Sequence, residues 1–200
     1  MTLDDNTLQE RIHELEKEIM DKKQALAKLR KDLIPQEIKD YTLIDKDGKE
    51  VQLSELFGDS NEMLLVFNMG KTCRWCTLWA DGYNGISQHL QSRAAFIVVS
   101  PDPPEVQQEF ADTREWDFPM LSYQGSDIGK DLGYQTEDGY YMPGVISLSK
   151  SKEGKICYHS KAFFGPSDNY CVQYDFMDLL PKGAKNWQPQ YEYSTEISNN

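Results

Sequence analysis

The chain has 200 residues, of which 39% are hydrophobic and 27% charged, a composition typical of one globular domain with appendages. Its net charge of -12 argues against nucleic acid as a partner, because phosphate binding needs clustered lysine and arginine. The sequence has no apolar run near the roughly 20 residues that span a bilayer, and residues 1–20 are too polar for a signal peptide. We therefore expect a cytoplasmic protein that binds no membrane.

The N-terminal part has the pattern of an amphipathic helix. Between residues 8 and 33, apolar side chains recur at alternating steps of four and three, except where Lys22 takes one position of the seam. The pattern predicts a helix within residues 1–34 that ends before Pro35. Two interpretations stay open: the helix packs back on its own domain, or it forms a coiled coil with a second subunit in a homodimer.

Residues 35–182 are predicted to form one α/β domain with a mixed sheet, followed by a loose polar tail at 183–200. The order of apolar runs, turn residues and helical periods carries this prediction. In chain order we expect two short strands around an Asp-Gly turn (41–53), a short helix (53–58), a central strand (63–69), an interrupted helix (77–93), a strand (94–100), a helix (103–116), a strand (118–123), a helical turn (126–133), a hairpin (145–164) and a helix (172–181).

Cys73 and Cys76 are separated by two residues and lie between the central strand and the helix that follows it. A cysteine at a helix N-terminus is stabilised as a thiolate by unpaired backbone N–H groups and the helix dipole. The second cysteine, one turn further, can attack a mixed disulfide on the first. Cys73 is therefore predicted as the nucleophile and Cys76 as the resolving thiol, with Arg74 favouring the thiolate and Trp75 adding an apolar surface. Such a redox-active disulfide requires no other cofactor.

The run "MLLVFNMGKTCRWCTLWA" resembles the active-site strand, Cys-x-x-Cys and helix of the thioredoxin superfamily. "MPGVISLSKSKEGKI" resembles the segment in which that superfamily carries a cis-proline facing the cysteines. The resemblance implies that Pro143 is cis and that Met142 and Pro143 present backbone hydrogen bonds to an extended substrate.

The chain is still more similar to a bacterial thioredoxin-like family of unknown function, described as predicted dithiol-disulfide isomerases. "CTLWADGYNG", "YQGSDIGKDLG" and "MPGVISL" stand in the order of that family's motifs. This resemblance implies a thioredoxin-like α/β fold of the peroxiredoxin-like branch. It also implies a thiol-disulfide oxidoreductase that acts on a disulfide-bearing protein or a small-thiol disulfide.

The chain departs from thioredoxin itself beside the cysteines. Thr72 stands where thioredoxins have tryptophan, and Arg74 and Trp75 replace Gly-Pro. Phe67 and Asn68 occupy the region where thioredoxins carry a buried aspartate that moves protons. These departures indicate a specialised partner rather than a general reductase.

Other interpretations stay open at this point. A zinc site would need two ligands besides Cys73 and Cys76, and Cys157 and His159 are the candidates. Cys157 is predicted instead to be a buried core thiol, and Cys171 is predicted to have a packing role.

Tyr83 is predicted to line a pocket beside the dithiol, whereas the rest of "WADGYNG" fits a bent helix. The alternative functions are a non-enzymatic scaffold that dimerises through its first helix and a peroxide-reducing enzyme, although the Pro-x-x-x-Thr-x-x-Cys motif of peroxiredoxins is absent.

Overall fold

The computed structural model describes residues 4–193. In chain order, the elements are α1 (Asp5–Lys31), β1 (Gln36–Ile38), β2 (Thr42–Ile44), β3 (Glu50–Gln52), the 3-10 helix η1 (Leu53–Phe57), β4 (Glu62–Phe67), α2 (Arg74–Tyr83), α3 (Ser87–Gln91), β5 (Ala95–Ser100), α4 (Pro104–Thr113), β6 (Met120–Ser122), α5 (Ile128–Asp131), β7 (Gly144–Lys150), β8 (Ile156–Phe163) and α6 (Val172–Asp178). Within the described residues, no helix is both long and apolar enough to cross a membrane.

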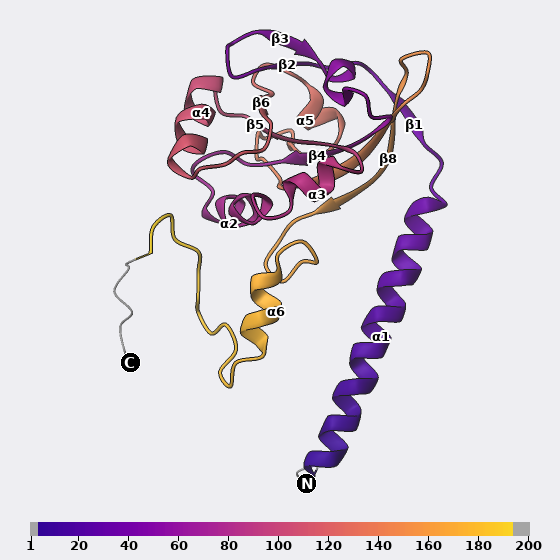
Figure 1. Cartoon of the computed structure of the whole chain (residues 1–200), viewed down its shortest axis with the longest axis vertical. Helices are drawn as coiled ribbons and strands as arrows, with labels where there is room; N and C mark the ends of the chain where they lie inside the picture. The colour runs from indigo at the N-terminus through magenta and orange to yellow at the C-terminus, as the bar shows by residue number, and fades with distance from the viewer. Residues whose placement is uncertain (1–3, 194–200) are drawn as a thin grey trace.

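The strands form one mixed sheet of eight in the order β1-β8-β7-β4-β5-β6-β2-β3 (Figure 1). Strands β4, β5 and β6 run parallel, and β7 pairs with β4 in the antiparallel direction. The apolar run of β4 lies at the centre of the sheet, where Leu65, Val66 and Phe67 are at most 3% exposed. Because both faces of this strand are covered, its sequence is continuously apolar instead of alternating.

Two hydrophobic cores flank the sheet. The larger one joins η1 and α5 to one face through Phe57 and Ile128, and the second joins α2 to the other face through Trp79 and Ala80. Figure 1 shows α2 and α3 together on the side of the sheet opposite to α5. Helix α2 ends at Tyr83 and α3 begins at Ser87, which confirms the predicted interruption.

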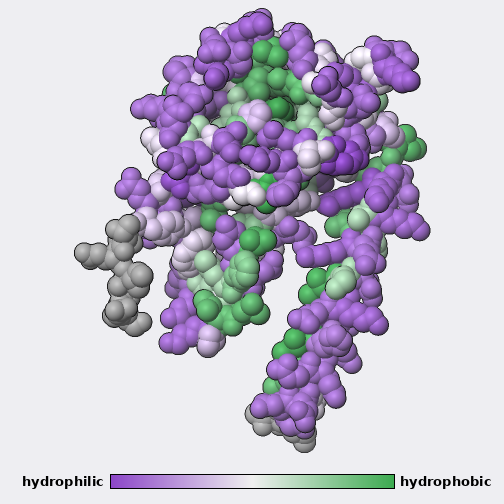
Figure 2. All heavy atoms as spheres, in the orientation of Figure 1, coloured by the Kyte–Doolittle hydropathy of each residue, from purple (hydrophilic) through white to green (hydrophobic). Residues whose placement is uncertain are grey.

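Helix α1 extends away from the sheet (Figure 1). It begins at the side-chain cap of Asp4, whose Oδ1 accepts a hydrogen bond from the Thr7 N–H at 2.8 Å. Every residue of α1 is at least partly exposed, and its apolar side chains line one edge of the helix in Figure 2. The predicted helix is therefore confirmed. None of its residues is buried, and near its C-terminal end Arg30 donates a hydrogen bond to the Tyr170 hydroxyl at 3.3 Å.

The tail predicted from residue 183 is not loose over its described part. Pro189 is buried, and Trp187 packs edge-on against Tyr174 of α6 with 6.0 Å between ring centroids. The carbonyl of Tyr191 accepts a hydrogen bond from Arg114 at 2.6 Å. Trp187 and Tyr191, two of the aromatic residues in the segment predicted to be loose, therefore attach it to the domain.

Candidate functional site

The loop between β4 and α2 is held by two side chains. Asn68 is buried, and its Oδ1 accepts a hydrogen bond from the Gly70 N–H at 2.8 Å. The carboxylate of Asp102, which follows β5, accepts one from the Lys71 N–H at 2.7 Å. Gly70 has a φ of 99°, and a Cβ there would lie 2.8 Å from the Asp102 carboxylate oxygens, so glycine is required for this close approach. These contacts fix the entry to the helix that carries Cys73.

Cys73 is the N-cap residue of α2. Its Sγ accepts a hydrogen bond from the Cys76 N–H at 3.2 Å, which satisfies one of the free donors at the helix start. The pKa of Cys73 is lowered to about 7, first by a hydrogen bond from the Cys76 side chain and then by the backbone N–H groups of Cys76 and Trp75, which together outweigh partial burial. The N-cap position therefore favours the nucleophilic thiolate, as the sequence predicted.

Cys76 has the opposite environment. It is 2% exposed, and its Sγ accepts a hydrogen bond from the Met69 N–H at 3.4 Å. Its pKa is raised well above the ordinary value, first by its hydrogen bond to Cys73 and then by burial. Both cysteines are free thiols in the structure. The pair thus combines one accessible sulfur that ionises readily with one buried sulfur that keeps its proton.

The residues around Cys73 lie as follows. Thr72 is exposed, and Trp75 is half-buried and stacks on Tyr174 at 6.2 Å between centroids. The Arg74 guanidinium donates a hydrogen bond to the Gln188 side chain at 3.1 Å. The groups that lower the pKa of Cys73 are those of Cys76 and Trp75. The role of Arg74 as a thiolate stabiliser therefore stays a prediction.

The prediction that Pro143 is cis is wrong, because all peptide bonds within the described residues are trans. The backbone here is engaged by the domain itself. The Met142 N–H donates to the Tyr134 carbonyl at 2.8 Å, and the Pro143 carbonyl accepts from the Phe164 N–H at 2.9 Å. These bonds occupy the Met142 N–H and the Pro143 carbonyl, and the X–Pro bond is in the commoner trans isomer. Binding of a substrate by the Met142–Pro143 segment stays a prediction.

Tyr83 is a core residue. It is 6% exposed and packs edge-on against Phe96 and Phe118. It also borders an apolar groove of about 470 Å³ on the α2 face of the sheet, whose described lining residues include neither Cys73 nor Cys76. Tyr83 and Cys76 belong to the same hydrophobic core, and a pocket that Tyr83 shares with the dithiol stays a prediction.

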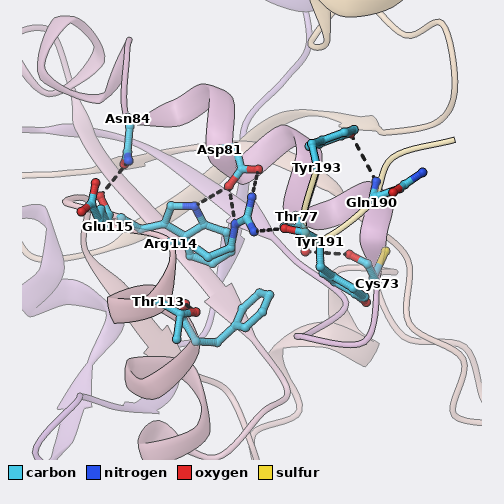
Figure 3. A network of polar contacts seen from close by, with 12 residues as sticks. Cys73, Thr77, Asp81, Asn84, Thr113, Arg114, Glu115, Gln190, Tyr191 and Tyr193 are labelled. Atoms are coloured by element: carbon cyan, nitrogen blue, oxygen red, sulfur yellow. Dashed lines mark hydrogen bonds and ion pairs between the residues drawn. The ribbon is translucent and has the colours of Figure 1, made fainter. Parts of the chain in front are cut away.

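The polar residues of "WADGYNG" have a role that the sequence interpretation missed (Figure 3). Asp81 of α2 forms an ion pair with Arg114, with Arg114 Nε 2.7 Å from Asp81 Oδ1, and accepts a hydrogen bond from the Trp116 indole at 2.9 Å. Asn84 donates to the Glu115 carbonyl at 2.8 Å. The motif therefore ties the active-site helix to the turn after α4. The only signal for it in the sequence was the density of polar residues in a helix that otherwise faces the core.

The zinc interpretation finds no support in the described chain. His159 contacts the Ser149 hydroxyl at 2.7 Å, and within residues 4–193 no group of three or more His, Cys, Asp or Glu side chains could hold a metal ion. Cys157 is partly exposed on β8, so its prediction as a core thiol is wrong. Cys171 is buried and donates a hydrogen bond to Gln173 at 2.9 Å, in agreement with a packing role.

Comparisons of sequence relate the chain to peroxiredoxins. It is 27% identical over 127 residues to the chloroplastic Peroxiredoxin Q of Triticum aestivum, a match that covers 63% of this chain and 58% of the wheat protein. It is 28% identical over 97 residues to a putative peroxiredoxin of Mycobacterium tuberculosis, covering 48% of this chain and 62% of that protein. The chain thus spans less than two thirds of the length of these relatives.

Comparison of structures shows the same fold. The crystal structure of Peroxidoxin BcpB from Mycobacterium tuberculosis superposes with a TM-score of 0.53 at 23% identity, covering 72% of this chain and 92% of that one. The predicted thioredoxin-like fold of the peroxiredoxin-like branch is therefore confirmed. Residues 6–198 match the family described as bacterial protein of unknown function (DUF899), and because the match spans nearly the whole chain, the protein belongs to that family.

Proposed function

We propose that this protein is a thiol-disulfide oxidoreductase in which Cys73 is the nucleophile and Cys76 the resolving thiol. The observation that carries the proposal is the contrast between the two sulfurs: the partly exposed Cys73 Sγ caps α2 and accepts the Cys76 N–H at 3.2 Å, whereas Cys76 is 2% exposed. These environments lower the pKa of Cys73 and raise that of Cys76. An exchange reaction needs a thiolate that attacks first and a protonated neighbour that reacts only afterwards. The N-cap position of Cys73 and the burial of Cys76 supply that order.

The reaction proceeds in two exchanges. The Cys73 thiolate attacks one sulfur of the substrate disulfide, so a bond from Cys73 to that sulfur forms while the substrate S–S bond breaks, and the departing thiolate takes a proton from water. Cys76 then loses its proton and attacks the Cys73 sulfur, which releases the second thiolate. The substrate disulfide is reduced to two thiols, and the Cys73–Cys76 pair is oxidised to a disulfide that an external thiol must reduce again.

Substitution of each cysteine tests this order. With a small disulfide as oxidant, the wild type is expected to form an internal disulfide, and Cys76→Ser is expected to stop at a mixed disulfide on Cys73. Cys73→Ser is expected to form neither, and Cys157→Ser serves as a control because Cys157 lies partly exposed on β8, outside the hydrophobic cluster that packs around the pair. Mass spectrometry of the alkylated peptides distinguishes the products. A wild type that forms no Cys73–Cys76 disulfide in any thiol buffer refutes the proposal.

Peroxide reduction is the second candidate, and the similarity to proteins named peroxiredoxins supports it. Here the Cys73 thiolate attacks the OH-bearing oxygen of a peroxide, the O–O bond breaks, and Cys73 becomes a sulfenic acid while the leaving hydroxide or alkoxide takes a proton from water. Cys76 then condenses with the sulfenic acid to give the same disulfide and water. A sulfenic acid trapped by dimedone in Cys76→Ser after peroxide treatment, formed faster than the mixed disulfide at equal oxidant concentration, would favour this candidate.

A further inference from the structure

The chain returns to the active site at its C-terminal end. We call residues 187–191 the strap. Gln188 accepts the hydrogen bond from Arg74, the residue next to Cys73, at 3.1 Å. Trp187 packs on Tyr174, which in turn stacks on Trp75. The strap is therefore in contact with both residues that separate the two cysteines, either directly or through one aromatic ring.

Tyr191 completes this contact on the other side. Its ring lies edge-on to Phe110 of α4 at 6.1 Å between centroids, and Figure 3 shows the side chain reaching toward Cys73. Burial raises the pKa of Tyr191, and the charge of Cys73 adds to that shift, which requires the phenol to lie near the thiol. Cys73 itself is only partly exposed.

The strap is anchored by the network of the "WADGYNG" motif. The Arg114 Nη1 group donates to the Tyr191 carbonyl at 2.6 Å while the rest of the guanidinium pairs with Asp81 of α2 (Figure 3). The side chains of Arg114 and Asp81 are 19% and 35% exposed, so the pair is partly shielded from water. One arginine thus joins the helix that carries the cysteines to the segment that covers them.

In a protein disulfide, each reacting cysteine is flanked by polypeptide on both sides, and this polypeptide must fit beside Cys73. Extended peptide segments usually bind through backbone groups that the host protein leaves exposed. The Met142 N–H and the Pro143 carbonyl are engaged within the domain, and the strap contacts the start of α2 through Arg74. We propose that the strap is a wall of the substrate site that admits low-molecular-weight disulfides to Cys73 and excludes disulfides of folded or extended proteins. This inference rests on the proposed function and chooses between its two substrate classes.

The reaction remains the exchange described above, with a small aliphatic disulfide RSSR as the oxidant. Cys73 forms a bond to one sulfur of RSSR, the first RS⁻ leaves and is protonated by water, and attack by Cys76 releases the second. The strap takes part only by its position. Tyr191 is accordingly a positioning residue, and its removal should change which disulfide reacts instead of whether the thiol reacts.

The test measures mixed-disulfide formation on Cys73 in the full-length Cys76→Ser background, with 2-hydroxyethyl disulfide as the small probe and insulin as the protein probe. Tyr191→Ala opens the wall, and Tyr158→Ala is the matched control, because Tyr158 is also partly buried but lies on β8 and packs against the larger core, on the face of the sheet opposite to α2. Since losing a few side-chain contacts shifts a local opening equilibrium by about tenfold, Tyr191→Ala should raise the insulin rate by about that factor. The rate with the small disulfide should change by less than about twofold, because this probe reaches Cys73 without local opening of the strap.

Each outcome has a distinct meaning. A rise of the insulin rate in Tyr191→Ala but not in Tyr158→Ala supports the inference, and the same rise in Gln188→Ala would extend it to the whole strap. Equal insulin rates with and without Tyr191, or a parallel rise for both probes, overturn the inference while leaving the proposed function intact. If neither probe reacts with Cys73 in any variant, the proposed function itself fails.

Discussion

Cys73 and Cys76 are three residues apart, and yet their pKa values are displaced in opposite directions because each sulfur is the main influence on the other. The hydrogen bond between the two side chains stabilises the thiolate of Cys73 and the thiol of Cys76 at the same time. Helix N-cap donors and burial then reinforce the asymmetry. Hydrogen bonding between the two sulfurs is therefore the main cause of the difference between their pKa values, and the proposed order of attack follows from it.

This asymmetry predicts a pH dependence. A lowered thiol pKa means that the thiolate is present above the pKa and lost as the pH falls, so alkylation of Cys73 by iodoacetamide should have its midpoint near pH 7. Cys76→Ala removes the first cause of the shift and should move the midpoint toward the ordinary value of about 8.5. Cys76→Ser keeps a hydroxyl donor and should move it less. Peptide mass spectrometry separates Cys73 from the other cysteines, and an unchanged midpoint in Cys76→Ala would contradict this explanation.

Gly144 gives a second prediction at this scale. A Cβ at this position would lie 2.3 Å from the Ala162 carbonyl and 2.6 Å from the Tyr134 ring, which packs flat on Phe67 beside the active-site loop. Gly144→Ala should therefore lower the free energy of unfolding by about 1 to 3 kcal/mol through overpacking. Gly82→Ala is the control, because Gly82 lies in α2 with open space around it. This substitution should raise the free energy of unfolding by about 0.5 to 1 kcal/mol. Urea unfolding of the reduced proteins measures both, and a neutral Gly144→Ala would be evidence against the close packing.

At the scale of elements, the sequence predicted most of the fold. Apolar runs and turn residues located β2 to β8, and the break near Gly82 to Gly85 appeared where expected, because these features depend on neighbours within a few residues. Strand β1 was not predicted, because this short and mostly polar segment is a strand through its pairing with β8. The position of Cys73 at a helix start followed from the same local pattern. These signals are short in range, so they do not depend on how the chain folds back on itself.

The parts that escaped prediction are contacts between distant segments. Asp81 and Arg114 are 33 residues apart, and Arg114 and Tyr191 are 77 apart, so no periodicity relates them. The geometry at Pro143 also depends on partners from elsewhere, since Tyr134 and Phe164 bind its neighbouring backbone groups. The candidate site was thus found by its local motif, while the residues that cover and support it were not.

The link between α2 and α4 predicts a measurable coupling. Asp81→Asn removes the charge that faces Arg114 and should lower the free energy of unfolding by about 1 to 2 kcal/mol, a range that allows for partial exposure of the pair. Asp59→Asn is the control, because Asp59 is exposed after η1. In a double-mutant cycle with Arg114→Gln, the two substitutions should cost less together than the sum of their separate effects. Additive effects would mean that the ion pair does not stabilise the fold.

Among the described residues, apolar side chains are exposed to solvent along α1 and around α6. The stripe of α1 is exposed by 41% to 65%, and α6 exposes an apolar face in which Phe176 and Leu179 are 68% and 83% exposed. Figure 2 shows apolar side chains along α1 and over α6. In proteins, most of the stability of a helix comes from burial of its apolar face rather than from its intrinsic propensity. The alternative function as a non-enzymatic scaffold requires that α1 bind a second protein chain through this apolar stripe.

A homodimer through α1 is the prediction that remains from the heptad pattern. Ile19 lies on the stripe and is 54% exposed, whereas Gln24 lies off the seam, so Ile19→Glu and Gln24→Glu add the same charge to different faces. If α1 pairs with a second copy, Ile19→Glu should sediment as a monomer while Gln24→Glu and the wild type sediment as dimers. Activity on a small disulfide should be unchanged in all three, because the dithiol lies on α2. A wild type that is monomeric, or an Ile19→Glu variant that stays dimeric, would show that α1 does not join two copies. A loss of thiol-disulfide exchange in Ile19→Glu alone would instead link the helix to the chemistry at Cys73.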